Sequence, residues 1–354
     1  MLLLLLSIAP LLVVTSPYHR FQSNQRITEC HCVPLHLCPD DDIALNGHGL
    51  LDPRIGSRVC PDPNEICCDK KETVKPPTTS RCGIQGDGRV KSRITSKTSA
   101  SFGEFPWNLI IQESGGDKET NLYKCGASLI HPRVAITVAH CVASYFEEPE
   151  RIQVRAGEYD LGSRNEPLPF QENFVEEILV HPDYDALSLK NDIAILILSE
   201  SFQLDGNVGL ICLASSTEVI MENRCTASGW GKDAHNDGKY SPVLKKVQLP
   251  IVARTLCLET LRSTRLGPRY NLHKSFICAG GKKGQDSCKG DGGSPLICPL
   301  LEESDRFVQI GIVSWGIGCG LEGIPGVYVN VPLYLEWIEE EMTDRDLDTS
   351  VFKL

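Results

Sequence analysis

Short apolar runs separated by turn residues dominate the chain from residue 94 onward. They are rich in β-branched residues and bounded by Gly, Pro, Asn or Asp, as in 107–111 (WNLII), 133–139 (RVAITVA), 151–157 (RIQVRAG), 192–198 (DIAILIL), 311–316 (GIVSWG) and 326–331 (GVYVNV). Such runs at regular spacing predict the strands of an all-β barrel or sandwich. Apolar residues recur at helical intervals only in 331–342 (VPLYLEWIEEEM), so we expect one helix there. The acidic residues 342–354 are expected to form a mobile tail.

Residues 1–16 (MLLLLLSIAPLLVVTS) form an apolar run that ends in small residues. The run suits the core of a signal peptide, although it lacks a preceding Lys or Arg, and it is short for a membrane span. A short membrane anchor is the alternative. No later segment reaches about 18 unbroken apolar residues, so the mature protein is expected to be soluble and extracellular.

Composition and charge narrow the class of protein further. A chain of 354 residues allows two or three domains, and its net charge of −11 argues against nucleic acid or an anionic membrane as the main partner. The sixteen cysteines are an even number far above that of ordinary cytosolic chains. They therefore indicate disulfides formed in an oxidising compartment.

Six cysteines crowd into residues 29–68, where they define a small separate module: Cys30, Cys32, Cys38, Cys60, Cys67 and Cys68. A segment of this size cannot bury enough apolar area to fold without cross-links, although fifteen pairings are formally open. A generic knotted module or a zinc site is the alternative, and zinc is disfavoured in a secreted, cysteine-dense segment. Residues 69–93 then read as a linker, rich in Pro, Thr, Lys and Gly.

Three motifs in the β-rich part carry a resemblance to trypsin-like serine proteases. They are TVAHC (137–141), NDIAIL (191–196) and DSCKGDGGSP (286–295). Their order is that of a chymotrypsin-type triad, in which His140 would be the general base and Asp192 the carboxylate that orients it. The nucleophile position holds Gly292, which has no side-chain oxygen. The resemblance implies two six-stranded β-barrels over residues 94–341 with a degenerate triad.

The cysteine-dense module resembles the clip domain of arthropod proteases, with ECHCVPLHLC (29–38) opening it and the adjacent pair Cys67 and Cys68 closing it. The insect clip-domain serine protease homologues, which carry glycine at the nucleophile position, are also similar to this chain in the segments 156–160 (AGEYD) and 165–169 (NEPLP). The two resemblances imply eight disulfides: Cys30–Cys67, Cys32–Cys60, Cys38–Cys68, Cys82–Cys212, Cys125–Cys141, Cys225–Cys298, Cys257–Cys278 and Cys288–Cys319.

The resemblance also implies a specificity pocket. Asp286 matches the pocket-floor aspartate that prefers Arg or Lys, and Ser314, Gly316 and Gly326 match the pocket walls. Either the pocket still holds a basic side chain of a partner, or it is a relic of ancestry, which we favour. The amides of Gly290 and Gly292 would remain as an oxyanion-type site. Ser294 lies too far along the chain to replace the missing nucleophile without a reshaped loop.

The linker contains a candidate cleavage site. Arg89, Lys91 and Arg93 form a basic stretch that trypsin-like enzymes could cut, and a solvated spacer is the alternative. Cleavage after Arg93 would free an Ile94 amine able to pair with Asp291, although Ser96 and Lys97 replace the glycines that follow in relatives.

A calcium site is a further expectation from the resemblance. In some relatives the loop that here holds Glu158 and Glu166 binds calcium through hard oxygen ligands. Two solvated carboxylates are the alternative, and no other cofactor is expected.

The function implied by the resemblance is that of an extracellular, non-catalytic cofactor or regulator. Its partners would be clip-domain proteases and prophenoloxidase or other haemolymph proteins, in the melanisation response of arthropod innate immunity. The alternatives are an active trypsin-like endopeptidase and an adhesive protein that binds microbial surfaces.

Overall fold

The computed structural model describes residues 31–34, 65–68, 81–86, 98–114, 122–163, 166–216, 220–232 and 239–354. The chain divides into two compact units, residues 1–73 and 74–354. In the first unit, strands β1 (His31–Pro34) and β2 (Glu65–Cys68) pair antiparallel, with Cys32 opposite Cys67. Each of the three disulfides expected in this unit has one cysteine outside the described residues, and the signal peptide lies outside them as well.

The first part of the second unit is a closed six-stranded barrel. Its strands pair in the order β3-β4-β5-β8-β7-β6. Their bounds are Asn108–Glu113 (β3), Leu122–His131 (β4), Val134–Thr137 (β5), Ile152–Ala156 (β6), Gln171–Val180 (β7) and Ala194–Leu198 (β8). All residues of β5 and β8 are buried, which explains why these segments are continuous apolar runs rather than alternating ones.

The second barrel is built from one curled sheet in the order β11-β10-β14-β15-β16-β13-β12, with β9 added beside β15. The sheet begins with β11 and ends with β12, which are consecutive pieces of one stretch of chain interrupted at Leu249 and Pro250. The two ends of the sheet are therefore adjacent in the sequence, as expected of a barrel-like sheet. The bounds are Cys212–Leu213 (β9), Thr226–Gly229 (β10), Lys245–Gln248 (β11), Ile251–Val252 (β12), Phe276–Gly280 (β13), Pro295–Pro299 (β14), Phe307–Trp315 (β15) and Pro325–Asn330 (β16).

These two barrels confirm the predicted all-β fold class, and each of the six short apolar runs between residues 107 and 331 overlaps a strand. The predicted C-terminal helix is also present, as a 3-10 turn at Val331–Tyr334 followed by α3 (Leu335–Thr343). Shorter helical pieces are α1 (Ala139–Val142) and 3-10 turns at Ala143–Tyr145, Pro149–Arg151 and Glu222–Arg224. Among the described residues, no helix is both long and apolar enough to cross a membrane.

One helix was not predicted. Helix α2 (Arg254–Arg262) buries only Cys257 and Leu261, one turn apart, and has no side-chain cap at its N-terminus. Its polar composition gives little helical periodicity in the sequence. The helix is held instead by its disulfide from Cys257 to Cys278 of β13.

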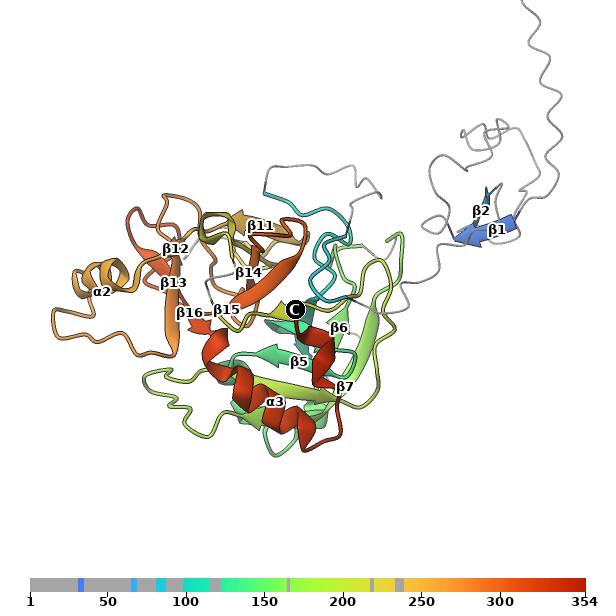
Figure 1. Cartoon of the computed structure of the whole chain (residues 1–354), viewed down its shortest axis with the longest axis horizontal. Coiled ribbons are helices and arrows are strands. Elements are labelled where there is room, and N and C mark those ends of the chain that lie inside the picture. The colour runs from blue at the N-terminus through green and yellow to red at the C-terminus, as the bar shows by residue number, and fades with distance from the viewer. Residues whose placement is uncertain are drawn as a thin grey trace, which may run out of the picture. The chain divides into compact units, whose positions relative to one another are not determined.

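The expectation of a mobile acidic tail at residues 342–354 is wrong. After α3 the chain forms another 3-10 turn at Thr349–Phe352, which Asp348 caps by accepting a hydrogen bond from the Ser350 amide. Arg345 pairs with Glu177 of β7 at 2.7 Å, and Phe352 is fully buried. In Figure 1 the C-terminus lies close to β5 and β6 in the view and does not extend away from the barrels. The segment is ordered because one aromatic side chain, rather than an apolar period, anchors it.

We expect Phe352→Ala to lower the free energy of unfolding by about 3–5 kcal/mol, since a large buried ring would leave a cavity. Denaturant unfolding measures this. The neighbouring Leu354 is 51% exposed, so Leu354→Ala is the matched control and should change the free energy by less than about 0.5 kcal/mol. Equal effects of the two changes would contradict the docked arrangement of the C-terminus.

Candidate functional site

His140 and Asp192 lie together where the two barrels meet. His140 is in α1, directly after β5, and Asp192 precedes β8, the strand paired with β5. The Asp192 carboxylate is fully buried and accepts from the His140 backbone N–H at 2.9 Å and from the Ser314 hydroxyl at 2.7 Å. His140 Nδ1 lies 2.8 Å from Asp192 Oδ2. This contact orients the imidazole so that Nε2 is the nitrogen left for chemistry.

Gly292 is the residue that faces His140 Nε2. A Cβ atom added to Gly292 would lie 3.5 Å from that nitrogen and 3.8 Å from His140 Cε1, which is ordinary van der Waals contact. The Gly292 carbonyl accepts a hydrogen bond from the Gly126 amide at 2.8 Å, so β4 holds this part of the loop in place. The position therefore has room for a side chain next to the base, and the chain provides none there.

Ser294 does not replace the missing hydroxyl. Its side chain is buried, and its Oγ lies in the space that a Cβ atom on Gly126 or Gly229 would enter. Its amide donates to the Asp291 carbonyl at 2.9 Å. The geometry agrees with the sequence argument that rescue by Ser294 needs a reshaped loop.

A cavity of about 300 Å³ is lined by His140, Gly292 and Asp286. Ser314, Gly316 and Gly326 border it, as does Gly290. A Cβ atom on Gly326 would lie 3.1 Å from Asp286 Oδ1, so glycine keeps the cavity open at its floor. All residues that the sequence assigned to the pocket are thus brought together.

Only one of the two oxygens of the Asp286 carboxyl has a hydrogen-bond partner among the described residues. Oδ2 accepts from the Gly320 amide at 2.9 Å, whereas Oδ1 is buried and has no hydrogen-bond partner among the described residues. Burial raises the pKa of Asp286 to about 6. A buried carboxylate with one unused oxygen at the end of a slot is suited to a guanidinium or ammonium group.

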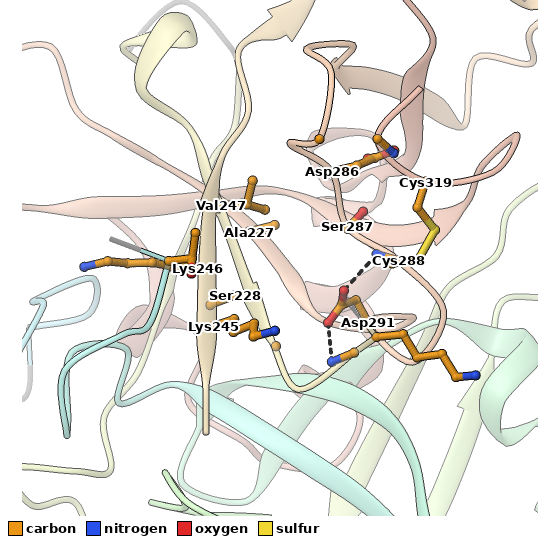
Figure 2. Close-up of a pocket in the computed structure, with 16 residues that line it drawn as sticks. Ala227, Ser228, Lys245, Lys246, Val247, Asp286, Ser287, Cys288, Asp291 and Cys319 are labelled. Carbon is orange, nitrogen blue, oxygen red and sulfur yellow. Dashed lines mark hydrogen bonds between the residues drawn. A yellow bond between two sulfur atoms is a disulfide. The ribbon is translucent and has the colours of Figure 1, made fainter. Parts of the chain in front are cut away.

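Asp291 lies beside a second cavity, of about 400 Å³, shown in Figure 2. Its two carboxyl oxygens accept from the backbone amides of Gly231 and Cys288, each at 2.8 Å, and burial raises its pKa to about 6. Arg93 and Ile94, expected to supply an amine to Asp291 after cleavage, lie outside the described residues. That pairing remains a prediction.

The backbone near the expected oxyanion-type amides is held by residues that the sequence analysis did not single out. Tyr123 donates its hydroxyl hydrogen to the Gly290 carbonyl at 2.5 Å, and its ring meets that of Tyr240 edge-on. A Cβ atom on Gly290 would approach Tyr240 to 2.5 Å, and Gly290 has a positive φ of 100°. In the sequence, Tyr123 lies two residues before Cys125, and this proximity was the signal that could have pointed to it.

Glu158 and Glu166, the candidate calcium ligands, are close neighbours. Glu158 is paired with Arg155 at 2.7 Å, and Glu166 Oε1 accepts from the amides of Tyr159 and Asp160. Glu166 Oε2 is buried without a partner among the described residues. Burial, and then the nearby Glu158 carboxylate, raise the pKa of Glu166 to about 7. The unused oxygen suits a cation, but Arg155 already neutralises Glu158, and calcium binding stays a prediction.

The cysteines near His140 offer no metal site. Cys125 and Cys141 are close enough to His140 to form a ligand group, but their sulfurs are bonded to each other. The described residues contain no free cysteine. Their disulfides are the pairings implied by the resemblance: Cys82–Cys212, Cys125–Cys141, Cys225–Cys298, Cys257–Cys278 and Cys288–Cys319.

Comparison with known proteins gives two family matches. The trypsin family matches residues 94–338, and the family described as "Serine protease Clip domain PPAF-2" matches residues 19–69. The chain is 43% identical to Phenoloxidase-activating factor 2 of Galleria mellonella over 79% of this chain and 96% of that protein. It is 35% identical to Inactive CLIP domain-containing serine protease A8 of Anopheles gambiae, over 89% of this chain and 90% of the other. A third relative, Inactive CLIP domain-containing serine protease A28 of the same species, is 36% identical over 90% of each chain.

Proposed function

This chain belongs to the trypsin family and carries a clip domain, and on that premise we propose that it is a non-catalytic protease homologue. The observation that carries the proposal is Gly292, a residue without a side-chain oxygen, at the position that faces His140 Nε2. Loss of a triad serine alone costs about 2 × 10⁶ in turnover, or roughly 8–9 kcal/mol of barrier. A site that has lost its serine can still bind ligands and still has its backbone amide donors.

The proposed role is extracellular regulation of a clip-protease cascade. The names of two kinds of relative support it, one a phenoloxidase-activating factor and the others inactive clip-domain proteases. The apolar run at residues 1–16 and the abundance of cysteines support secretion. The proposed partners are clip-domain proteases and prophenoloxidase.

The proposal is tested by reconstitution with purified components. The protein, cleaved in its linker, should raise phenoloxidase activity when added to prophenoloxidase and its activating protease. By itself it should neither hydrolyse arginyl amides nor react with serine-directed phosphonate probes. Stoichiometric labelling of any serine in residues 94–338 would favour the active-protease alternative. Binding to microbial cell walls without any effect on phenoloxidase would favour the adhesive alternative.

We also expect the Asp286 cavity to bind benzamidine, an aromatic amidinium, in a pH-dependent way. The cation needs the ionised carboxylate, and the unliganded carboxyl has a pKa of about 6. Ionisation therefore increases as pH rises, and affinity should be about tenfold higher near pH 7 than near pH 5. Calorimetric titration at the two pH values measures this. Asp286→Asn is the control and should remove both the binding and its pH dependence, whereas pH-independent binding to the unaltered protein would contradict the expectation.

A further inference from the structure

Helix α2 and the loop after it carry a basic surface on an acidic protein. Residues 254–274 contain five Arg or Lys residues and one Glu, a net charge of +4, whereas the whole chain has −11. All five cations are exposed: Arg254, Arg262, Arg265, Arg269 and Lys274. We call these five residues the basic surface. In Figure 1, α2 and its following loop project from the second barrel.

Among the described residues, none of the five cations of the basic surface lies within ion-pair distance of a carboxylate. By contrast, Arg151, Arg155 and Arg345 each contact two carboxylates elsewhere in the barrels. Unpaired charges that repel one another cost stability, so their accumulation in one segment is not explained by folding.

Two of the five cations also shape the loop. Arg254 donates to the carbonyls of Phe276 and Leu272, and Arg262 donates to the Tyr270 carbonyl at 2.8 Å. Among the described residues, the side chains of Arg265, Arg269 and Lys274 make no comparable contact. Burial first, and then Lys190, Lys274 and Arg254, lower the pKa of His273, so two cations of the basic surface lie near this histidine of the loop.

The loop is held rigidly near the cavity lined by His140 and Asp286. The ring of Tyr270 meets that of Trp315 edge-on at 6.2 Å, and Trp315 borders that cavity. Leu266 packs against the buried cluster around the Cys257–Cys278 disulfide. The basic surface is therefore presented on a fixed element beside the cleft, which lowers the entropy cost of binding there.

Apolar groups among the cations indicate the class of ligand. Leu256 of α2 is 56% exposed, and Pro268 of the loop is exposed as well. Arginine forks match carboxylates in bidentate geometry, and exposed apolar side chains add area that another polypeptide can cover. An anionic polysaccharide could bind the cations, but it would not need the exposed Leu256.

We propose that the basic surface is a second binding site, separate from His140 and Gly292, and that it binds an acidic, leucine-containing segment of a partner polypeptide. The site uses charge complementarity for attraction and orientation, with Leu256 as its apolar contact. The proposal does not depend on the loss of catalysis, because none of these residues touches the degenerate triad.

The test is titration of the full chain with a short fluorescent peptide rich in glutamate and leucine. Binding should weaken as salt is raised. The double change Arg265→Glu and Arg269→Glu should lower affinity at least about tenfold. The matched control is Lys282→Glu with Lys283→Glu, which alters two exposed lysines and changes the net charge equally. It should lower affinity less than about twofold, since general repulsion is screened at moderate salt.

Three results would overturn the proposal. They are no binding of the peptide to the unaltered chain, an equal loss of affinity in the two double variants, and binding of a sulfated glycan where the peptide does not bind. Unchanged melting temperatures establish that both variants fold. If the arginine reversal fails to fold, Arg265→Gln with Arg269→Gln replaces it, with Lys282→Gln and Lys283→Gln as its control. The arginine-to-glutamine variant must then lose more affinity for the peptide than the lysine-to-glutamine control.

Discussion

Gly292→Ser should turn this protein into a hydrolase for arginyl amides once its linker has been cleaved. The serine of a complete triad accounts for about 10⁶ in turnover, so we expect at least about a 10³-fold gain over the unaltered protein even if alignment is imperfect. The rate of arginyl amide hydrolysis measures the gain. Phosphonate labelling should then occur at residue 292.

The structure gives the reason why one change should suffice. A Cβ atom at position 292 fits at 3.5 Å from His140 Nε2, so the serine oxygen can come within hydrogen-bond reach of the base. Asp192 already orients that base through its 2.8 Å contact with Nδ1. Gly293 must stay glycine, because its φ is 84° and a Cβ there would lie 2.1 Å from the Gly126 carbonyl oxygen.

The controls separate the triad from the activation step. Gly292→Ser with His140→Ala should be inactive, and Gly292→Ala should match the unaltered protein. In Gly292→Ser, the further change of residues 95–97 to Val-Gly-Gly tests whether Ser96 and Lys97 hinder the Ile94 amine from reaching Asp291. Activity only in that variant would locate a second lesion at the activation turn. No activity in any cleaved, folded variant would contradict a preserved site.

Cleavage of the linker should leave the clip-containing fragment attached to the barrels. Cys82 is bonded to Cys212 of β9, and the disulfide is buried. A cut between Arg89 and Arg93 would fall after Cys82, so the two fragments should migrate together on a denaturing gel without reductant. They should separate completely with reductant.

Non-covalent contacts should keep the fragments together even after reduction under native conditions. The Gly83 amide donates to the Leu210 carbonyl at 2.7 Å, and the Phe307 amide donates to the Gly83 carbonyl at 2.8 Å. Arg306 donates to the Cys82 carbonyl at 3.2 Å. The control is Cys82→Ala with Cys212→Ala, which should co-elute on gel filtration yet separate on a denaturing gel. Separation of the unaltered, cleaved chain without reductant would refute the tether.

The sequence by itself determined the all-β fold class, and its resemblance to trypsin-like proteases implied the two barrels and the identity of the site. Strands such as β5 and β8 are apolar throughout because both of their faces are buried, and a continuous apolar run is readable without a structure. His140, Asp192 and Asp286 could be found because each lies in a motif whose neighbours are also recognisable. Gly292 was evident for the same reason.

Only the tertiary structure decided how the remaining pieces pack. The C-terminal segment was predicted to be a mobile acidic tail, yet Phe352 anchors it in the main core, where its 3-10 turn contacts β4 and β9. Helix α2 had too little apolar period to be predicted, because a disulfide to β13 stabilises it. The basic surface likewise needed the structure, since spacing along a chain cannot show which cations lack a carboxylate nearby. In each case the deciding interaction joins residues distant in sequence, and local patterns do not encode such contacts.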